Sequence, residues 1–278
     1  MKKIVNLTLL LTLIILFKNK DLITNSIAIS FLLWEKFLIP SIYPILIITE
    51  LLINNRVDLI IPKFINKIFN RIFKFDGQVI PIFLLGIISG SPTSTLIYQK
   101  AYHQLLISKN DYQKLVICGT FINPLFFIKI ANTNIKMIIF ILLLNYTYAL
   151  ISFIIIKPSN IVLKNNQVDN KNLINIITDN FKVMLNILSI IIISNIFIVI
   201  LSYYHFNQFI IGNIEITNGL NYFTNPFNIA FLASFLGIAI NCQIKSIINN
   251  QHLYNTYLIH QIIKSLICAC ATSMFTQI

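Results

Sequence analysis

Six small or polar residues interrupt an otherwise apolar stretch in the first third of the sequence. Residues 89–94 read Ser-Gly-Ser-Pro-Thr-Ser, and the uncharged window around them, residues 77–99, is long enough to cross a hydrocarbon core. Pro92 lacks a backbone donor and the hydroxyls compete for helical hydrogen bonds, so the segment predicts the break in a discontinuous helix. Transporters bind small solutes at such breaks through half-helix ends, freed carbonyls and hydroxyls. The alternative is a kinked helix that packs through its small residues.

Polar residues interrupt apolar sequence at three further places: at Asn123-Pro124, after Glu215, and over residues 241–243. An Asn-Pro dipeptide favours a turn, and amides and hydroxyls can pair with a nucleobase-like or other polar ligand. The same side chains could instead hold helices together. The candidate substrate-binding residues are Ser89, Gly90, Ser91, Pro92, Thr93, Ser94, Asn123, Pro124, Glu215, Thr217, Asn218, Gly219, Asn241 and Gln243.

Two acids stand next to interrupted apolar segments, Glu50 and Glu215. A carboxylate at membrane depth is costly unless it is paired or functional. Either acid could couple a proton, or bind a cationic group or a sugar hydroxyl. For Glu50 the alternative, which we favour slightly, is a solvated position at the headgroup level beside Arg56.

The sequence does not predict an enzyme. A serine protease would need a serine within hydrogen-bond reach of a base, and the Gly-Ile-Ile-Ser-Gly run lacks the Gly-x-Ser spacing. Neither a Walker A motif nor a paired acidic metal motif occurs, and the four cysteines form no Cys-x-x-Cys pair. We therefore expect no catalytic residue, no metal site and no cofactor, and we expect the cysteines to be small buried hydrophobes.

Composition places the chain in a membrane. Of its 278 residues 56% are hydrophobic and only 11% are charged, and the mean hydropathy is +0.79. The net charge of +12 comes from basic residues scattered between apolar runs, so nucleic acid is not expected. The expected partners are the lipid bilayer and a small polar solute or cation, and a homodimer is left open.

The expected architecture is all-α, a polytopic membrane protein with about seven or eight crossings and discontinuous or re-entrant helices. Residues 1–21 read as an N-terminal anchor helix, and Pro40 and Pro44 predict a broken or re-entrant segment. Residues 56–74 alternate basic and apolar side chains, as an amphipathic helix at an interface does. The positive-inside rule places this basic loop in the cytoplasm.

An internal repeat is predicted within one membrane domain of residues 1–278. Residues 48–52 resemble residues 216–220, and Leu-Gly-Ile at 85–87 resembles Leu-Gly-Ile at 236–238. In each half the Leu-Gly-Ile match is followed by a polar interruption, at residues 89–94 in the first half and at 241–243 in the second. The predicted boundaries are a first half at 22–156, a polar linker at 157–172 and a second half at 173–278. Paired interrupted segments in two halves point to a transporter site between the repeats.

The motifs at residues 40–50, 85–92, 123–126, 215–219 and 237–243, taken in order, resemble the YlbJ-type sporulation integral membrane proteins, within the nucleoside-recognition or Gate domain group. The resemblance implies an inner-membrane protein of a spore former, with helices like those of nucleoside and ion carriers, but it supplies no substrate. Two functions are expected from it and from the breaks. The first is a transporter of a small polar solute; the alternative is a non-transporting assembly factor of the spore envelope.

Overall fold

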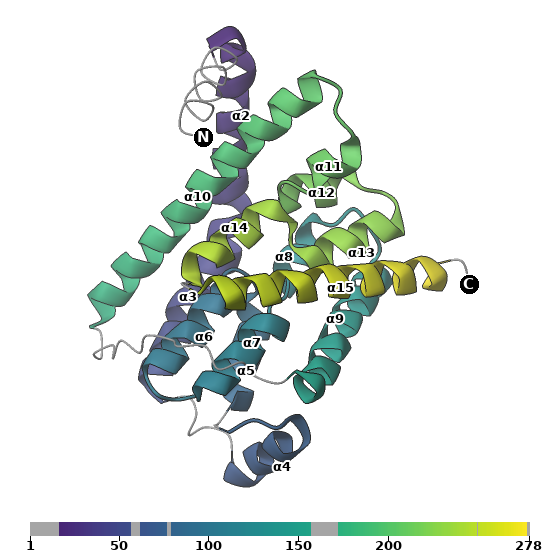
Figure 1. Cartoon of the computed structure of the whole chain (residues 1–278). Helices are drawn as coiled ribbons and strands as arrows, with labels where there is room; N and C mark the ends of the chain where they lie inside the picture. Colours follow the sequence, from purple (N-terminus) through teal and green to yellow (C-terminus); the bar gives the residue numbers. More distant parts are fainter. Residues whose placement is uncertain (1–16, 57–61, 77–78, 157–171, 249, 277–278) are drawn as a thin grey trace.

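The structure is a computed structural model that describes residues 17–56, 62–76, 79–156, 172–248 and 250–276. All regular structure in this part of the chain is helical (Figure 1), which confirms the predicted all-α class. The helices that are long and apolar enough to cross a membrane are Lys20–Asn54, Ile135–Ile155, Leu173–Tyr203, Pro226–Ile247 and Gln251–Phe275. These five support the predicted polytopic membrane protein, while the count of seven or eight crossings stays a prediction. Most of the predicted anchor and linker lies outside the described residues.

The first long helix is continuous. It joins α2 (Lys20–Leu33), a π-helical turn η1 (Trp34–Leu38) and α3 (Ile39–Asn54), so the break predicted from Pro40 and Pro44 is wrong. Pro40 lies in the first turn of α3, directly after the π-helical turn, where a missing donor is tolerated, and α3 accommodates Pro44 in its interior. This helix packs along α10 (Leu173–Tyr203) (Figure 1).

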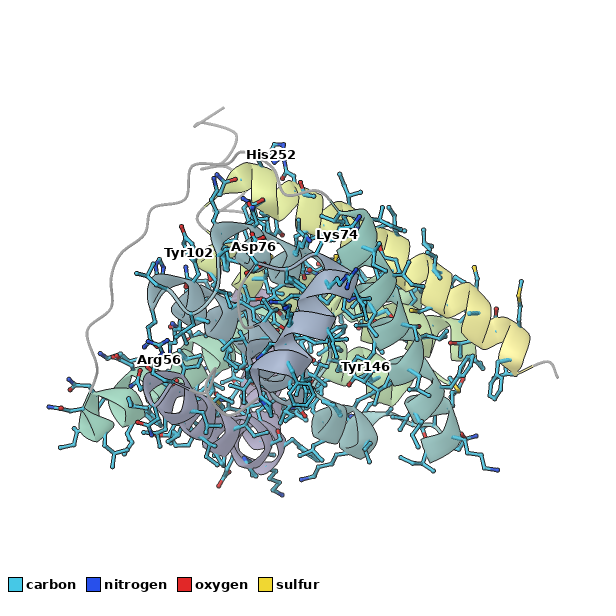
Figure 2. All side chains as sticks on the ribbon, turned by 90° about the horizontal axis from the view of Figure 1, so that it is seen from below. Arg56, Lys74, Asp76, Tyr102, Tyr146 and His252 are labelled. Carbon is cyan, nitrogen blue, oxygen red and sulfur yellow. The ribbon has the colours of Figure 1, made fainter. Side chains whose placement is uncertain are left out.

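The basic segment forms α4 (Lys63–Phe73), which lies at one end of the bundle (Figure 1) and packs on its core through Phe69 and Phe73. Residues 57–61 of the predicted amphipathic helix are outside the described residues. The exposed apolar side chains of α4 are Phe64, Ile65, Ile68 and Ile72. Figure 2 views the molecule from this end, with Lys74 and Asp76 just after α4. The buried Lys114 donates to the Lys74 carbonyl at 2.5 Å and so holds the C-terminal end of α4.

Two groups of short helices follow the long ones in the same order. The first group is α5 (Val79–Ser89), α6 (Thr93–His103), α7 (Lys109–Cys118) and α8 (Pro124–Ile130), followed by the long α9 (Ile135–Ile155). The second is α11 (Gln208–Gly212), α12 (Ile216–Tyr222), α13 (Pro226–Phe235) and α14 (Gly237–Ile247), followed by the long α15 (Gln251–Phe275).

In each group the first two helices pack on each other as a hairpin, α5 on α6 and α11 on α12. Residues 79–99 therefore fold back on themselves, with the Tyr98 ring in the space beside Gly86. The predicted break lies between Ser89 and Thr93, but Thr93 and Ser94 already belong to α6. The interruption expected at Asn123 is confirmed, whereas the one expected after Glu215 lies at residues 213–215, because Ile216–Tyr222 form α12.

The interruption predicted over residues 241–243 is wrong, because these residues are helical within α14. The break lies at residues 236–237, where both Leu236 and Gly237 have a positive φ, of 73° and 74°. The left-handed backbone of Leu236 and Gly237 thus turns the chain without any polar side chain. Polarity alone therefore misplaced this break by about one helical turn.

The contacts between the two groups are reciprocal. Helix α7 packs on α15 and α13 packs on α9, while α6 packs on α14 and α12 packs on α8. The two long helices of the N-terminal sides, α2–α3 and α10, pack on each other. This arrangement brings all four interruptions to the middle of the molecule.

Candidate functional site

The first two interruptions cross in direct contact. The Ser91 amide donates to the Phe121 carbonyl at 2.6 Å, and Asn123 Nδ2 donates to the carbonyls of Ile88 and Ser89, both at 3.1 Å. Asn123 Oδ1 also caps α8. Gly90, with φ +68°, lies so close that a Cβ there would stand 2.4 Å from the Asn123 nitrogen. We call this contact the first crossing.

The other two interruptions form the second crossing. The amides of Ile238 and Ala239 donate to the carbonyls of Asn213 and Ile214 at 2.8 and 2.9 Å. Asn241 Nδ2 donates to the carbonyls of Phe235 and Gly237 at 2.9 and 2.7 Å. The broken backbone is thus satisfied within the protein, as an apolar environment requires.

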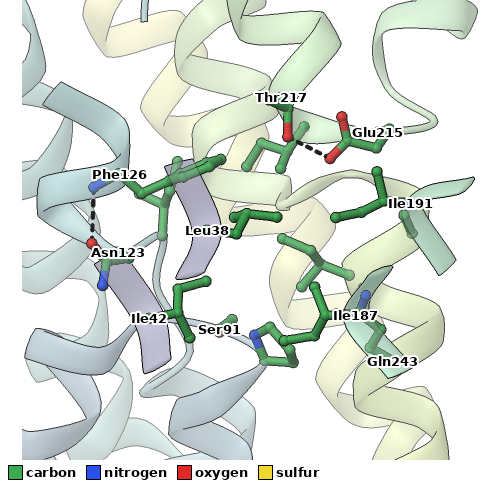
Figure 3. A pocket seen from close by; sticks show the side chains of 15 residues that line it. Leu38, Ile42, Ser91, Asn123, Phe126, Ile187, Ile191, Glu215, Thr217 and Gln243 are labelled. Carbon is green, nitrogen blue, oxygen red and sulfur yellow. Dashed lines mark hydrogen bonds between the residues drawn. The ribbon is translucent and has the colours of Figure 1, made fainter. Parts of the chain in front are cut away.

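A pocket of about 40 Å³ lies between the two crossings. Because one water molecule needs about 10–15 Å³ of cavity volume on this measure, the pocket has room for about three. Figure 3 shows Glu215 and Thr217 toward one end and Ser91 and Gln243 toward the other, with aliphatic side chains between them. The aliphatic walls are Leu38, Ile42, Ile122, Ile187, Ile191, Ile216 and Ile240.

Among the described residues, Glu215 is the only charged one that lines this pocket, and it is 3% exposed. Its Oε1 accepts from the Thr217 hydroxyl at 2.7 Å, and its Oε2 accepts from the Asn218 amide at 3.0 Å. Glu215 lies between two candidate spans. Burial raises the pKa of its carboxyl, against the opposing effect of these hydrogen bonds. Across the pocket, Gln243 Oε1 is buried and has no hydrogen-bond partner among the described residues.

A second hollow, an open cleft of about 1120 Å³, lies between the C-terminal end of α10 and the α11–α13 segment. Asn218 and Tyr222 of α12 line this cleft, whereas Thr217 and Ile216 of the same helix line the pocket. The seven-residue helix α12 therefore separates the closed pocket from open space.

The predicted binding residues divide into two sets. Those that line the pocket are Ser91, Pro92, Asn123, Glu215, Thr217 and Gln243. Those that do not are Ser89, Gly90, Thr93, Ser94, Pro124, Asn218, Gly219 and Asn241.

The residues outside the pocket mostly shape the crossings. Ser94 lies next to the pocket, with its Oγ 3.2 Å from Ser91 Oγ. Gly219 packs against the Gly212 carbonyl, and Asn218 Nδ2 donates to Asn195 of α10. Asn241 holds the second crossing. Pattern reading marked these residues because helix breaks and binding sites use the same residue types.

Sequence reasoning missed a buried network that joins the crossings. Lys264 of α15 is 1% exposed, and its Nζ donates to the Thr120 carbonyl at 2.7 Å. Gln261 Nε2 donates to Thr120 Oγ1 at 2.7 Å and to the Tyr257 hydroxyl at 3.0 Å. The Tyr257 hydroxyl donates to Asn241 Oδ1 at 2.6 Å. Lys264 was visible in the sequence as the single formal charge of the last apolar run.

The favoured position of Glu50 is wrong. Glu50 is 4% exposed and accepts from Lys100 Nζ at 2.6 Å and from Asn180 Nδ2 at 2.7 Å. It thereby joins α3, α6 and α10, whereas Arg56 is exposed. Expecting all four cysteines to be buried is also wrong, because Cys242 and Cys270 are exposed.

Comparisons with protein-family models, with curated proteins and with solved structures find no match to this chain. The resemblance to YlbJ-type proteins therefore stays a prediction.

Proposed function

We propose that the chain is a membrane carrier for a small polar solute, with the pocket between the two crossings as its binding site. The observation that carries this proposal is the meeting of four helix interruptions around one buried pocket with a carboxyl group. Polar groups from three of these segments, on Ser91, Asn123 and Glu215, line it. Apolar walls with a few placed polar groups are typical of sites for small molecules.

A two-repeat, Gate-like architecture is supported by the order of the helices and by their reciprocal contacts. Each half has a long helix, a hairpin, a discontinuous helix and a second long helix. The five candidate spans together with α7–α8 make six crossings, and the predicted anchor helix would make seven. The two hairpins then enter the membrane without crossing it. Inner-membrane placement, a cytoplasmic α4 and a link to sporulation stay predictions.

In the conformation described, the pocket is small and is lined almost entirely by buried side chains. A pocket of about 40 Å³ cannot hold a nucleoside, and α12 stands between it and the open cleft of about 1120 Å³. A movement of α12 would join the two spaces. This helix has only seven residues and begins beside the pocket, and its displacement would break the hydrogen bond from Asn218 Nδ2 to Asn195 of α10.

Ligand-dependent thermal stability tests the binding site. The purified protein is heated with nucleosides, nucleobases, dipicolinate and simple cations, because a ligand that binds only the folded state raises the apparent melting temperature. We expect one class to raise it for wild type and not for Ser91→Ala. The matched control is Ser189→Ala, on the exposed face of α10. A shift that persists unchanged in Ser91→Ala places the ligand elsewhere and contradicts the proposal.

A further inference from the structure

We infer that the Glu215 carboxyl is the proton-binding site of the carrier, protonated while the pocket is closed and deprotonated when α12 opens it to the cleft. This inference rests on the proposed function and names the coupling ion. In the opening step the Glu215 O–H bond breaks, the proton passes to water in the cleft, and the carboxylate keeps the electron pair.

The closed pocket supplies no positive charge to balance a carboxylate. The donors to Glu215 are a hydroxyl on Thr217 and the Asn218 amide, both neutral. Within the part of the chain that the structure describes, no basic residue lines the pocket. A buried carboxylate without a counter-charge is strongly disfavoured, so the group binds a proton or another cation.

The arrangement suits a proton better than a metal ion. A hard cation takes six or more oxygen ligands, but the oxygens of Ser91 and Gln243 lie toward the other end of the pocket from Glu215, with aliphatic side chains between (Figure 3). Within the residues that the structure describes, no group of three His, Cys, Asp or Glu side chains could hold a metal. A proton needs only the carboxyl oxygen itself.

The elements around Glu215 offer no competing titratable group inside the pocket. Helices α11 and α13 contain no titratable side chain. The charged or titratable residues of η1, α3, α8, α10, α12 and α14 do not line the pocket; they are Glu35, Lys36, Tyr43, Glu50, Lys129, Asp179, Lys182, Tyr203, Tyr222, Cys242 and Lys245. The protonation state of the pocket is therefore set by Glu215.

The position of Glu215 links its charge to α12. It precedes Ile216, the first residue of the helix, and its oxygens hold the first turn through Thr217 and Asn218. Asn218 already lines the cleft. Ionisation of the carboxyl favours its hydration, and the water available is in the cleft, on the far side of that first turn. Loss of the proton thus favours the open position of α12.

The pH dependence of stability tests the protonation. The folded protein binds this proton more tightly than the unfolded chain does, so raising the pH lowers the stability of wild type relative to Glu215→Gln. As the pH rises above the ordinary pKa of a glutamate, about 4.3, we expect the gap in apparent melting temperature to widen by roughly 3 °C per pH unit until the pH passes the raised pKa of Glu215. Glu35→Gln, which removes an exposed acid of η1, serves as the control and should run parallel to wild type. Parallel curves for wild type and Glu215→Gln would overturn the inference.

Pocket accessibility tests the coupling. A thiol is placed in the pocket by Ala239→Cys, with the exposed Cys270 kept as an internal reference and the other cysteines replaced. We expect the ratio of labelling rates at positions 239 and 270 to rise with pH, by up to tenfold per pH unit, and to be flat in Glu215→Gln. A ratio that depends on sodium and not on pH would overturn proton coupling while leaving the carrier intact. A thiol that is never labelled would contradict the carrier as well.

Discussion

The two crossings share one backbone design and differ in charge and tightness. At the first, the Lys264 ammonium satisfies the Thr120 carbonyl, and Gly90 touches the Asn123 backbone. At the second, the acid Glu215 has no basic partner in the pocket, and a Cβ on Gly237 would still have 3.3 Å to its nearest neighbour. Helix α12 beside the second crossing is crowded as well, since a Cβ on Gly219 would stand 2.1 Å from the Gly212 carbonyl oxygen. The charge is therefore the difference that makes the first crossing the fixed support and the second the part that can change.

The network on α15 gives the two crossings a physical connection. It runs from Thr120 through Gln261 and Tyr257 to Asn241, with hydrogen bonds of 2.6–3.0 Å. Every member is buried. A displacement at the second crossing would therefore move hydrogen-bonded side chains that also contact the first crossing.

The largest expected effect contrasts the two glycines. Gly90→Ala adds a methyl group 2.4 Å from the Asn123 nitrogen at a φ of +68°, so we expect a loss of about 2–5 kcal/mol of stability. Gly237→Ala meets the strain of its positive φ, about 1–2 kcal/mol, together with a milder crowding, because its Cβ would stand 3.3 Å from the Asn213 carbonyl oxygen and the Ile216 nitrogen. Apparent melting temperatures in one detergent compare them. Equal losses would show that the first crossing is no tighter than the second.

A smaller loss of stability is expected from two polar side chains that bind across the halves. Lys264 lies on α15, the last helix of the second half, and Asn145 lies on α9, the last helix of the first half. Lys264→Met leaves the Thr120 carbonyl without its charged donor and should cost about 2–3 kcal/mol. Asn145→Leu removes a neutral hydrogen bond to Ser234 and should cost about 1 kcal/mol. Thermal unfolding of both variants checks the order. A larger loss for Asn145→Leu would reverse the assignment of the fixed support.

The smallest effect sharpens the connection between the crossings. Gln261→Leu keeps both crossings and breaks the link between Thr120 and Tyr257, at a cost of about 0.5–1.5 kcal/mol. We expect the Ala239→Cys thiol to become more accessible while the folded protein remains intact. Quantitative maleimide labelling measures this. Unchanged accessibility would mean that the crossings move independently.

The sequence predicts three of the interruptions because their signals are local. Pro92, Asn123-Pro124 and Glu215 each change the backbone or cap a helix within a few residues. The break at residues 236–237 has no polar marker, since it depends on the positive φ of Leu236 and Gly237. Sequence reading therefore placed it on the polar residues that follow.

Pairings across the chain were beyond the sequence. Glu50 meets Lys100 and Asn180, and Lys264 reaches a carbonyl 144 positions away. Residues 48–52 lie in the long helix α3, whereas the matched residues 216–220 lie in α12 of a hairpin. The order of helices therefore gives a different correspondence between the halves from the one that the sequence match predicts. An alphabet rich in Ile and Leu gives little information on register.

Access to the pocket from both sides of the membrane tests the central claim most directly. In a background without Cys118, Cys242, Cys268 and Cys270, a single thiol is introduced at Ser91→Cys or at Ala239→Cys, one at each crossing. Vesicles of both orientations are then treated with a membrane-impermeant maleimide. A carrier predicts that each thiol is labelled in both orientations, because its site opens alternately to the two sides. Labelling from neither side would contradict the account and leave the crossings a purely structural role.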